Sequence, residues 1–355
     1  MYTRRDLGKF ALAGLPGAAV LLKSNLTFAS PLAKPKSKWA GVQVGLNVPY
    51  SLGTRTAMTG EDVLEKCVQL GVSAVELRAQ AIEKSIGLPD HLVLGPAPSD
   101  YEAARTPVGE VPGAPRRGGA IPESSSGSAP VGKGPPRTLD ELTAYKAGAN
   151  ELRKWRLSVS LNKAKDLRKK YEDGGVEIQI VKFDGIADLA DDELDYGFTL
   201  AKAVGARAIS GELSMPSVKR LGQAADSHKM PIGLHGHVAA TPAIWEEAFS
   251  YARYNFANVD IGHFVAGNNT SPLPFIQQHH DRIVHIHVKD RKMRLGPNVP
   301  FGHGDTPIRE VLQAIRDHRW SVQATIEFEI PLPQEADRAA EIRKSLDYCR
   351  NCLLE

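Results

Sequence analysis

The sequence predicts a closed (β/α)8 barrel, the TIM-barrel architecture. Short runs rich in Val and Ile alternate with helical patterns eight times along the 355 residues. Strict alternation favours parallel strands joined by crossover helices. Eight such units match a barrel of about 250 residues with insertions. An open doubly wound sheet is the second interpretation, but residues 45–50 lack the glycine-rich phosphate loop that it favours after the first strand.

The first two strands are predicted at 41–46 and 72–77, on either side of an amphipathic helix at 61–70 that Gly71 ends. From about 86 to 136 the chain is rich in Pro, Gly and Ser, and it predicts a flexible insertion after the second strand. A helical pattern resumes at 139–171, with a break near Ser158.

The remaining six strands follow in regular order. Gly174 and Gly175 stop the preceding helix, and the acidic first turn at 191–193 suits a helix start. The predicted strands are 176–182, 206–212, 231–237, 258–263, 282–290 and 322–329. The predicted helices are 191–204, 218–228, 245–254, 273–280, 308–318 and 336–353.

The N-terminus has the pattern of an export signal. Arg4 and Arg5 precede a short apolar run at 11–22 that ends in small residues, which resembles a twin-arginine signal peptide. We expect a signal peptide at 1–30, a linker at 31–40 and one catalytic domain at 41–355, located in the periplasm or outside the cell. A tail that happens to contain two arginines is the alternative.

Composition excludes several classes of protein. The net charge of +3, with 42% hydrophobic and 24% charged residues, is ordinary for a globular protein and gives no case for nucleic acid. The apolar run at 11–22 is too short to span a bilayer, so we expect no membrane association of the mature form. Cys349 and Cys352 are spaced CxxC within a helical pattern, which favours two thiols on a helix face over a redox or zinc site.

Polar residues collect where six successive strands end. Carboxylates are rarely buried unless paired or bound to metal, and the active site of a barrel lies at the carboxyl ends of its strands. The residues in question are Lys182, Glu212, His235, His237, Asp260, His263, His285, His287, Lys289, Glu327 and Glu329. Their convergence predicts a divalent-metal site with Glu212, Asp260, His287 and Glu327 as ligands, suited to Mn²⁺, Co²⁺, Zn²⁺ or Mg²⁺.

The order of these residues resembles the xylose isomerase-like superfamily of sugar isomerases and epimerases. The segments that carry the resemblance are 259–263, 285–290 and 302–307. It implies metal binding by the same four residues, with Glu329 as an alternative to Glu327. The fifth strand departs from the commoner Glu-x-His pattern and contains His235 and His237, as in exported members described broadly as sugar phosphate isomerase/epimerase.

These residues allow proton removal next to a sugar carbonyl, giving an enediolate. Glu212 or Glu327 can take the proton, and the other glutamate, His235 or His237 can return it. Lys182, His235, His263 and Lys289 are predicted to bind the substrate. The predicted function is therefore a sugar isomerase or epimerase.

Three alternatives remain at this point. A lyase could eliminate the aglycone from a 3-keto-glycoside, since departure of a β-substituent can follow the same proton removal. The surplus histidines His237, His263 and His303 would suit a metal-dependent hydrolase. A non-catalytic sugar-binding protein is the third. The expected partner is a small sugar or keto-glycoside, and a homo-oligomer is left open.

Overall fold

The structure is a computed structural model that describes residues 34–53, 57–95, 97 and 138–355. The predicted signal peptide at 1–30 and most of the predicted insertion lie outside the described residues. The fold, the site and the contacts below concern the described residues.

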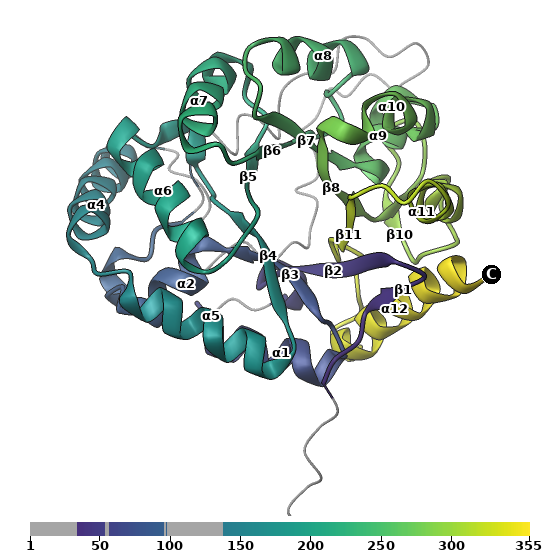
Figure 1. Ribbon diagram of the computed structural model, residues 1–355, viewed down its shortest axis with the longest axis horizontal. Helices are drawn as coiled ribbons and strands as arrows, with labels where there is room; N and C mark the ends of the chain where they lie inside the picture. Colours follow the sequence, from purple (N-terminus) through teal and green to yellow (C-terminus); the bar gives the residue numbers. More distant parts are fainter. Residues whose placement is uncertain (1–33, 54–56, 96, 98–137) are drawn as a thin grey trace, which may run out of the picture. The chain divides into compact units, whose positions relative to one another are not determined.

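Eight parallel strands close into a barrel (Figure 1). Each strand pairs with the next one, and β11 pairs with both β8 and β2, which closes the ring. The predicted fold is therefore confirmed. The strands are β2 (Val42–Val48), β3 (Ala74–Arg78), β4 (Glu177–Lys182), β5 (Ala208–Glu212), β6 (Ile232–His235), β7 (Asn255–Asp260), β8 (Ile283–Val288) and β11 (Gln323–Ile326).

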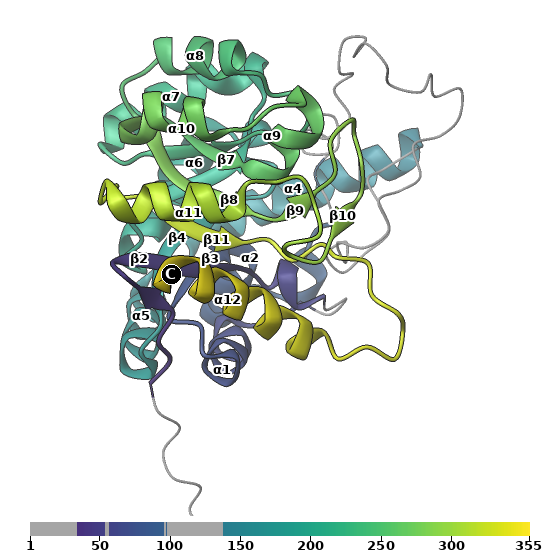
Figure 2. The ribbon, with the colours of Figure 1, turned by 90° about the vertical axis from the view of Figure 1, so that its right-hand side faces the viewer.

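Helices surround this barrel on the outside (Figure 1), and Figure 2 shows α11 and α12 crossing one side of it. The helices are α1 (Gly60–Leu70), α2 (Ala79–Ile86), α4 (Leu139–Ser158), α5 (Asn162–Gly174), α6 (Asp191–Ala203), α7 (Met215–His228), α8 (Pro242–Ser250), α9 (Ile261–Asn268), α10 (Leu273–His279), α11 (Ile308–Asp317) and α12 (Arg338–Leu354). The predicted break near Ser158 is confirmed as the boundary between α4 and α5.

Local sequence explains where several of these helices begin and end. Thr59 precedes α1 and forms a capping box with Asp62, in which each side chain accepts a hydrogen bond from the other residue's backbone N–H. Gly71 ends the helix in the left-handed conformation (φ 79°), which glycine adopts without steric cost.

The ordered fold extends beyond two of the predicted boundaries. Within the predicted linker 31–40, β1 (Lys38–Trp39) pairs antiparallel with β2, and Ser37 is buried and donates to the Val44 carbonyl. After β3 the chain forms α2, which was not predicted because its eight residues lie next to the Pro- and Gly-rich stretch. Leu88 and Leu92 follow α2 and pack with Leu152 of α4, so the start of the predicted insertion is part of the fold.

The sixth strand covers Asn255–Asp260 and so lies three residues earlier in the chain than the predicted 258–263. It ends at Asp260, because the Asp260 side chain accepts a hydrogen bond from the His263 N–H (2.7 Å) and caps α9. His263 therefore lies in the first turn of a helix and not on a strand. Lys289, Glu327 and Glu329 likewise lie just beyond the ends of β8 and β11. All of them remain at the carboxyl-terminal end of the barrel.

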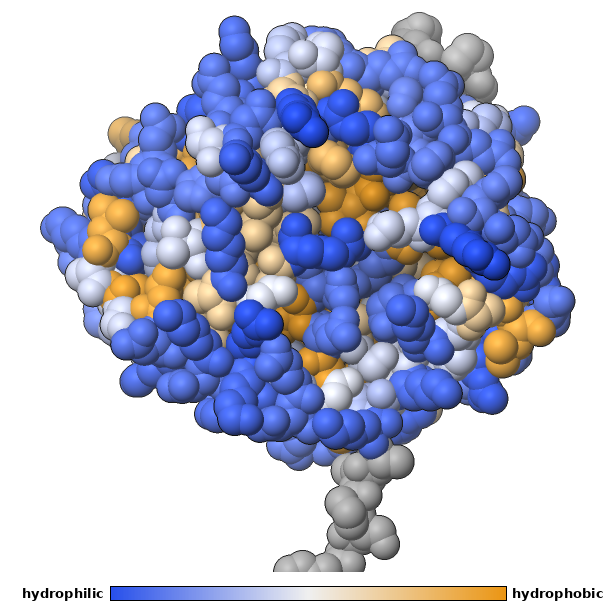
Figure 3. Space-filling view, viewed as in Figure 1, coloured by the Kyte–Doolittle hydropathy of each residue, from blue (hydrophilic) through white to orange (hydrophobic). Residues whose placement is uncertain are grey.

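The face seen in Figure 3 is mostly hydrophilic, with small hydrophobic patches scattered between hydrophilic residues. Among the described helices, none combines the length and the hydropathy needed to cross a bilayer. Cys349 and Cys352 lie in α12, where both are free and buried.

Candidate metal centre

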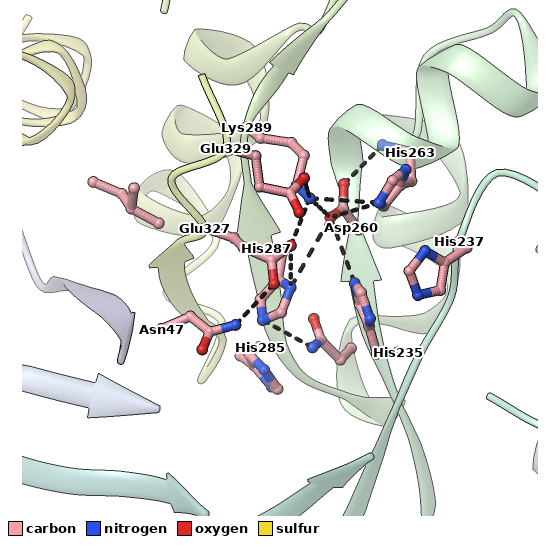
Figure 4. A network of polar contacts seen from close by, with 12 residues as sticks. Asn47, His235, His237, Asp260, His263, His285, His287, Lys289, Glu327 and Glu329 are labelled. Carbon is pink, nitrogen blue, oxygen red and sulfur yellow. Dashed lines mark hydrogen bonds and ion pairs between the residues drawn. The ribbon is translucent and has the colours of Figure 1, made fainter. Parts of the chain in front are cut away.

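Four side chains converge at the carboxyl-terminal end of the barrel (Figure 4). His235 ends β6, Asp260 ends β7, His287 belongs to β8 and Glu327 follows β11. All four are buried, and one potential ligand atom from each lies within 4.8 Å of all the others. His235 Nε2 is 3.5 Å from Asp260 Oδ2, and His287 Nδ1 is 3.4 Å from Glu327 Oε2. Parallel strands place these residues together because their carboxyl ends share one rim.

The nitrogen and oxygen atoms where these four side chains meet could coordinate a cation. Asp260 Oδ2 is buried beside Lys289 Nζ (2.9 Å), whereas His235 Nε2 and His287 Nδ1 are buried and have no hydrogen-bond partner among the described residues. Leaving such atoms unpaired costs about 1–3 kcal/mol each. Donor atoms about 2.1 Å from one ion lie roughly 3 to 4.2 Å apart. The pair distances of 3.4, 3.5 and 4.0 Å among these atoms fall in that range, and any pair as wide as the 4.8 Å limit would have to move closer to share one ion. The donor set of two imidazoles and two carboxylates suits Zn²⁺, Co²⁺ or Mn²⁺.

Lys289 balances part of the negative charge of the site. Its Nζ lies 2.9 Å from Asp260 Oδ2 and 2.5 Å from Glu327 Oε2 and Glu329 Oε2. Three carboxylates therefore share one ammonium group. Burial would lower the pKa of Lys289, but Asp260, Glu327 and Glu329 outweigh it and raise that pKa well above its usual value. The remaining excess of negative charge is a second reason to expect a cation here.

Glu327 and Glu329 have different surroundings. Glu327 Oε1 accepts a hydrogen bond from Asn47 Nδ2 (2.8 Å), which leaves Oε2 facing His287 and Lys289. Glu329 accepts from the Tyr50 hydroxyl (2.5 Å) and from Lys289, and it is not one of the four converging residues. Of the two carboxylates, Glu327 is the one placed to bind an ion.

Glu212 was predicted as a ligand, but it lies beside the group of four and not within it. Its Oε1 accepts from Lys182 Nζ (2.5 Å), and its Oε2 lies 3.0 Å from His235 Nδ1 and 2.8 Å from His237 Nε2. His235, predicted to bind the substrate, takes the place of Glu212 among the converging atoms. Burial would raise the pKa of Glu212, but Lys182, His235 and His237 hold it well below its usual value.

The other predicted site residues line the same end of the barrel. His237 has 22% of its side chain exposed and is the most open of the histidines around the cluster. His263 Nδ1 accepts from Arg291 Nη1 (2.6 Å), and its Nε2 lies 3.4 Å from Lys289 Nζ. Lys182 is buried and paired with Glu212, so its ammonium group faces a carboxylate and not an open cleft.

Glu76 is a site residue that the sequence interpretation missed. It lies inside β3 and is fully buried, with Oε1 3.2 Å from His285 Nε2 and Oε2 2.6 Å from His287 Nε2. Burial would raise the pKa of Glu76, but the two histidines hold it well below its usual range. Asn47 was missed as well. A carboxylate within the apolar run 72–77 was the available signal, since a buried charge needs a partner.

A comparison with known families and structures agrees with the fold. The family model described as "Xylose isomerase-like TIM barrel" matches residues 215–352. No curated protein matches the chain in sequence.

Several solved structures share the architecture. A xylose isomerase domain protein from Alicyclobacillus acidocaldarius subsp. acidocaldarius has 11% identity and a TM-score of 0.53, covering 88% of this chain and 100% of its own. A sugar phosphate isomerase/epimerase from Parabacteroides distasonis has 13% identity and a TM-score of 0.50, covering 88% and 97%. A xylose isomerase domain containing protein from Salmonella typhimurium LT2 has 11% identity and a TM-score of 0.50, covering 90% and 99%. At these identities the likeness concerns the fold.

The chain is a (β/α)8 barrel, and its residues 215–352 match the xylose isomerase-like family model.

Proposed function

We propose that the protein is a divalent-metal-dependent enzyme that isomerises or epimerises a sugar by removing a proton next to a carbonyl group. The observation that carries the proposal is the convergence of His235 Nε2, Asp260 Oδ2, His287 Nδ1 and Glu327 Oε2, in which the two ring nitrogens make no hydrogen bond among the described residues. The xylose isomerase-like fold supports a sugar as the substrate.

The ion would be held by those four residues. When bound, it would polarise the substrate carbonyl and lower the pKa of the neighbouring C–H group. In the ion-free protein, burial would lower the pKa of His287, but Glu327 and Glu76 raise it to about 10. The His287 ring is therefore protonated on both nitrogens at neutral pH, and metal binding through Nδ1 must displace the proton there.

The remaining side chains supply proton transfer and orientation. His237 is the most open histidine of the site, and its Nε2 hydrogen-bonds to Glu212, so it is placed to exchange a proton with a substrate carbon or hydroxyl. Lys289 presents an ammonium group beside Asp260 and Glu327, where it can donate to a substrate oxygen. Return of the proton to the opposite face gives an epimer, and return to the neighbouring carbon gives an isomer.

The decisive variant is Asp260→Asn. Asn is as good an N-cap as Asp, so α9 keeps its cap while the site loses a carboxylate. We expect the purified wild-type protein to bind about one divalent ion and to exchange substrate protons with D₂O on ketoses or 3-keto-glycosides. The variant should lose both properties with little change in thermal stability.

Asp337→Asn is the matched control. Asp337 caps α12 through the N–H groups of Ala339 and Ala340, so the chemical change is the same but lies outside the metal site. Exchange that survives in Asp260→Asn, or after metal removal by a chelator, would refute the proposed mechanism. Loss of a β-substituent from 3-keto-glycosides in the same assay would identify a lyase.

Export by the twin-arginine route remains a proposal as well. Its support is the sequence pattern around Arg4 and Arg5. Replacing both arginines by lysine should retain the protein in the cytoplasm, as measured by cell fractionation, and unchanged export would contradict it.

A further inference from the structure

We propose that Glu212 and Glu76 are positioning residues and not metal ligands, each fixing one histidine ligand so that a defined ring nitrogen faces the ion. Glu212 would present His235 through Nε2, and Glu76 would present His287 through Nδ1. This inference rests on the proposed function, because it concerns the same ion. It assigns opposite ring nitrogens to the two histidines.

The first half of the argument concerns His235. Its Nδ1 lies 3.0 Å from Glu212 Oε2, whereas its Nε2 has no hydrogen-bond partner among the described residues and lies 3.5 Å from Asp260 Oδ2. A neutral imidazole has one N–H group and one lone pair. A carboxylate accepts the N–H, so the proton belongs on Nδ1 and the lone pair on Nε2 points at the cluster.

The second half concerns His287, where the arrangement is reversed. Its Nε2 lies 2.6 Å from Glu76 Oε2, whereas Nδ1 faces Glu327 Oε2 at 3.4 Å and Asp260 Oδ2 at 4.0 Å. The Asn258 amide contacts the same Nε2 at 3.1 Å, and its Oδ1 is otherwise unpaired among the described residues. Turning the amide oxygen toward the ring would let Asn258 accept from that N–H as well.

Both oxygens of Glu212 have partners in the structure, although Glu212, His235 and His237 also form a group that could hold an ion. Oε1 accepts a hydrogen bond from Lys182 Nζ, and Oε2 is within hydrogen-bond distance of His235 Nδ1 and His237 Nε2. Lys182 has only 2% of its side chain exposed, so turning Glu212 toward the ion would leave a buried ammonium group without its carboxylate partner. The Lys182 pair therefore locks Glu212 in the orientation that supports His235.

Glu76, on β3, likewise has a partner at each oxygen. Its two oxygens face His285 Nε2 and His287 Nε2, and the side chain is completely buried. This also accounts for His285, whose position on β8 suggested a site residue. His285 helps to hold Glu76 in place through Oε1 and is not one of the group of four.

Cobalt spectroscopy separates a ligand from a positioning residue, because the visible bands of bound Co²⁺ depend on its ligand set. We expect Glu212→Gln and Glu76→Gln to keep the wild-type bands while Co²⁺ affinity falls by up to about 10-fold, because the Gln carbonyl still accepts the imidazole N–H. Glu212→Ala and Glu76→Ala should lose about 10–100-fold, the range for outer partners of a metal site. His235→Gln, a change of ligand, should alter the bands.

Lys182→Met is the matched control for Glu212. It removes the buried ion pair but leaves the contact between Glu212 and His235, so it should lower Co²⁺ affinity less than Glu212→Ala does. A change of the bands in Glu212→Gln as large as that in His235→Gln would overturn the assignment. A wild-type protein that binds no Co²⁺ would overturn both this inference and the proposed function.

A second measurement needs no variant and does not depend on how a variant folds. Nitrogen-15 NMR of the zinc-loaded wild-type protein reports which ring nitrogen carries the proton. We expect the proton on Nδ1 in His235 and on Nε2 in His287. Finding zinc bound through the opposite nitrogen of either ring would overturn the inference while leaving the metal site itself intact.

Discussion

The imidazole rings of the site differ in the residue that forms a hydrogen bond with each ring. His235 is hydrogen-bonded to Glu212, and His287 is hydrogen-bonded to Glu76. His263 instead accepts a hydrogen bond from Arg291. A nitrogen that accepts from a guanidinium group has used its lone pair, so the partner of each ring decides what the ring can do. Residue type alone does not distinguish these histidines, because all of them lie at strand ends or just beyond.

The choice between Glu327 and Glu329 gives a prediction at this scale. Glu327→Gln should weaken metal affinity by more than about 100-fold, beyond the 10–100-fold typical of outer partners, because Glu327 Oε2 belongs to the converging group. Glu329→Gln should cost less than about 10-fold, since Glu329 contacts Tyr50 and Lys289 instead. Calorimetric titration of the metal-free variants checks this, and equal losses would contradict it.

At the scale of elements, the junctions between strands and helices decide where the site residues lie. Asp260 ends β7 and caps α9 through Oδ1, while its other oxygen, Oδ2, faces the cluster. One carboxylate thus both starts a helix and offers a metal-binding atom. Beyond β8, Asp290 accepts from the N–H groups of Gly302, Gly304 and Thr306 and holds the loop that follows.

Glycine at 304 is required by close approach. A Cβ atom there would lie 1.8 Å from Asp290 Oδ1, so no larger residue fits without moving the carboxylate. The segment 302–307 that carries part of the family resemblance is therefore shaped by its contact with the end of the seventh barrel strand.

The capping box of α1 gives a prediction for an element away from the site. Thr59→Ala should lower the free energy of unfolding by about 1 kcal/mol at pH 7, because the Asp62 N–H loses its acceptor. Hydrogen bonds from the Thr59 side chain and backbone lower the pKa of Asp62 below its usual value. A lowered carboxyl pKa stabilises the fold above about pH 4, and this contribution is lost as the pH falls through the folded-state value.

Urea unfolding at pH 7 and pH 3 measures both effects. The destabilisation by Asp62→Asn should be smaller at pH 3 than at pH 7. Thr199→Ala is the matched control, because Thr199 is exposed inside α6 and alanine is the better helix former there, so the change should be close to neutral. A Thr59→Ala protein as stable as the Thr199→Ala protein would contradict the capping role.

At the scale of the whole molecule, closure of the barrel brings distant parts of the chain together. Asn47 and Glu327 are 280 residues apart and hydrogen-bonded, and Glu76 and His287 are 211 residues apart. These contacts exist because β11 pairs with β2 and completes the ring. The metal site is therefore complete only when the first and last strands have met.

The three cysteines report on the integrity of the whole fold. Cys67, Cys349 and Cys352 are free and fully buried. Burial raises the pKa of Cys67 to about 12 and also raises the pKa values of the other two thiols. We expect a thiol reagent at pH 8 to leave the native protein unlabelled, because thiolate is scarce and access requires unfolding. In urea all three should react.

The measurement is the number of thiols labelled against urea concentration, followed in parallel by circular dichroism. The two transitions should coincide. Rapid labelling of Cys349 or Cys352 in the native protein would instead point to an accessible CxxC pair and contradict the packed arrangement of α12.

Much of this architecture could be predicted from the chain alone. The eight barrel strands, most of the helices and the rim where polar residues collect follow from periodicity and from the rule that parallel strands share one end. Local patterns carry this information because strand alternation and helix caps depend on neighbours within a few residues. These patterns did not predict α2 and β1, which are short elements next to segments that the sequence assigns to an insertion or a linker.

The identity of the converging atoms required the folded chain. From strand-end position alone, Glu212 and His235 are equally good candidates for metal ligands, because both end a strand. The closed barrel shows that Glu212 contacts Lys182 and two histidines, while His235 Nε2 faces Asp260. Glu76 acquires its partners from a strand more than 200 residues away. Which oxygen or nitrogen is free depends on side-chain partners across the barrel, and those partners are set by closure and packing, which no local pattern encodes.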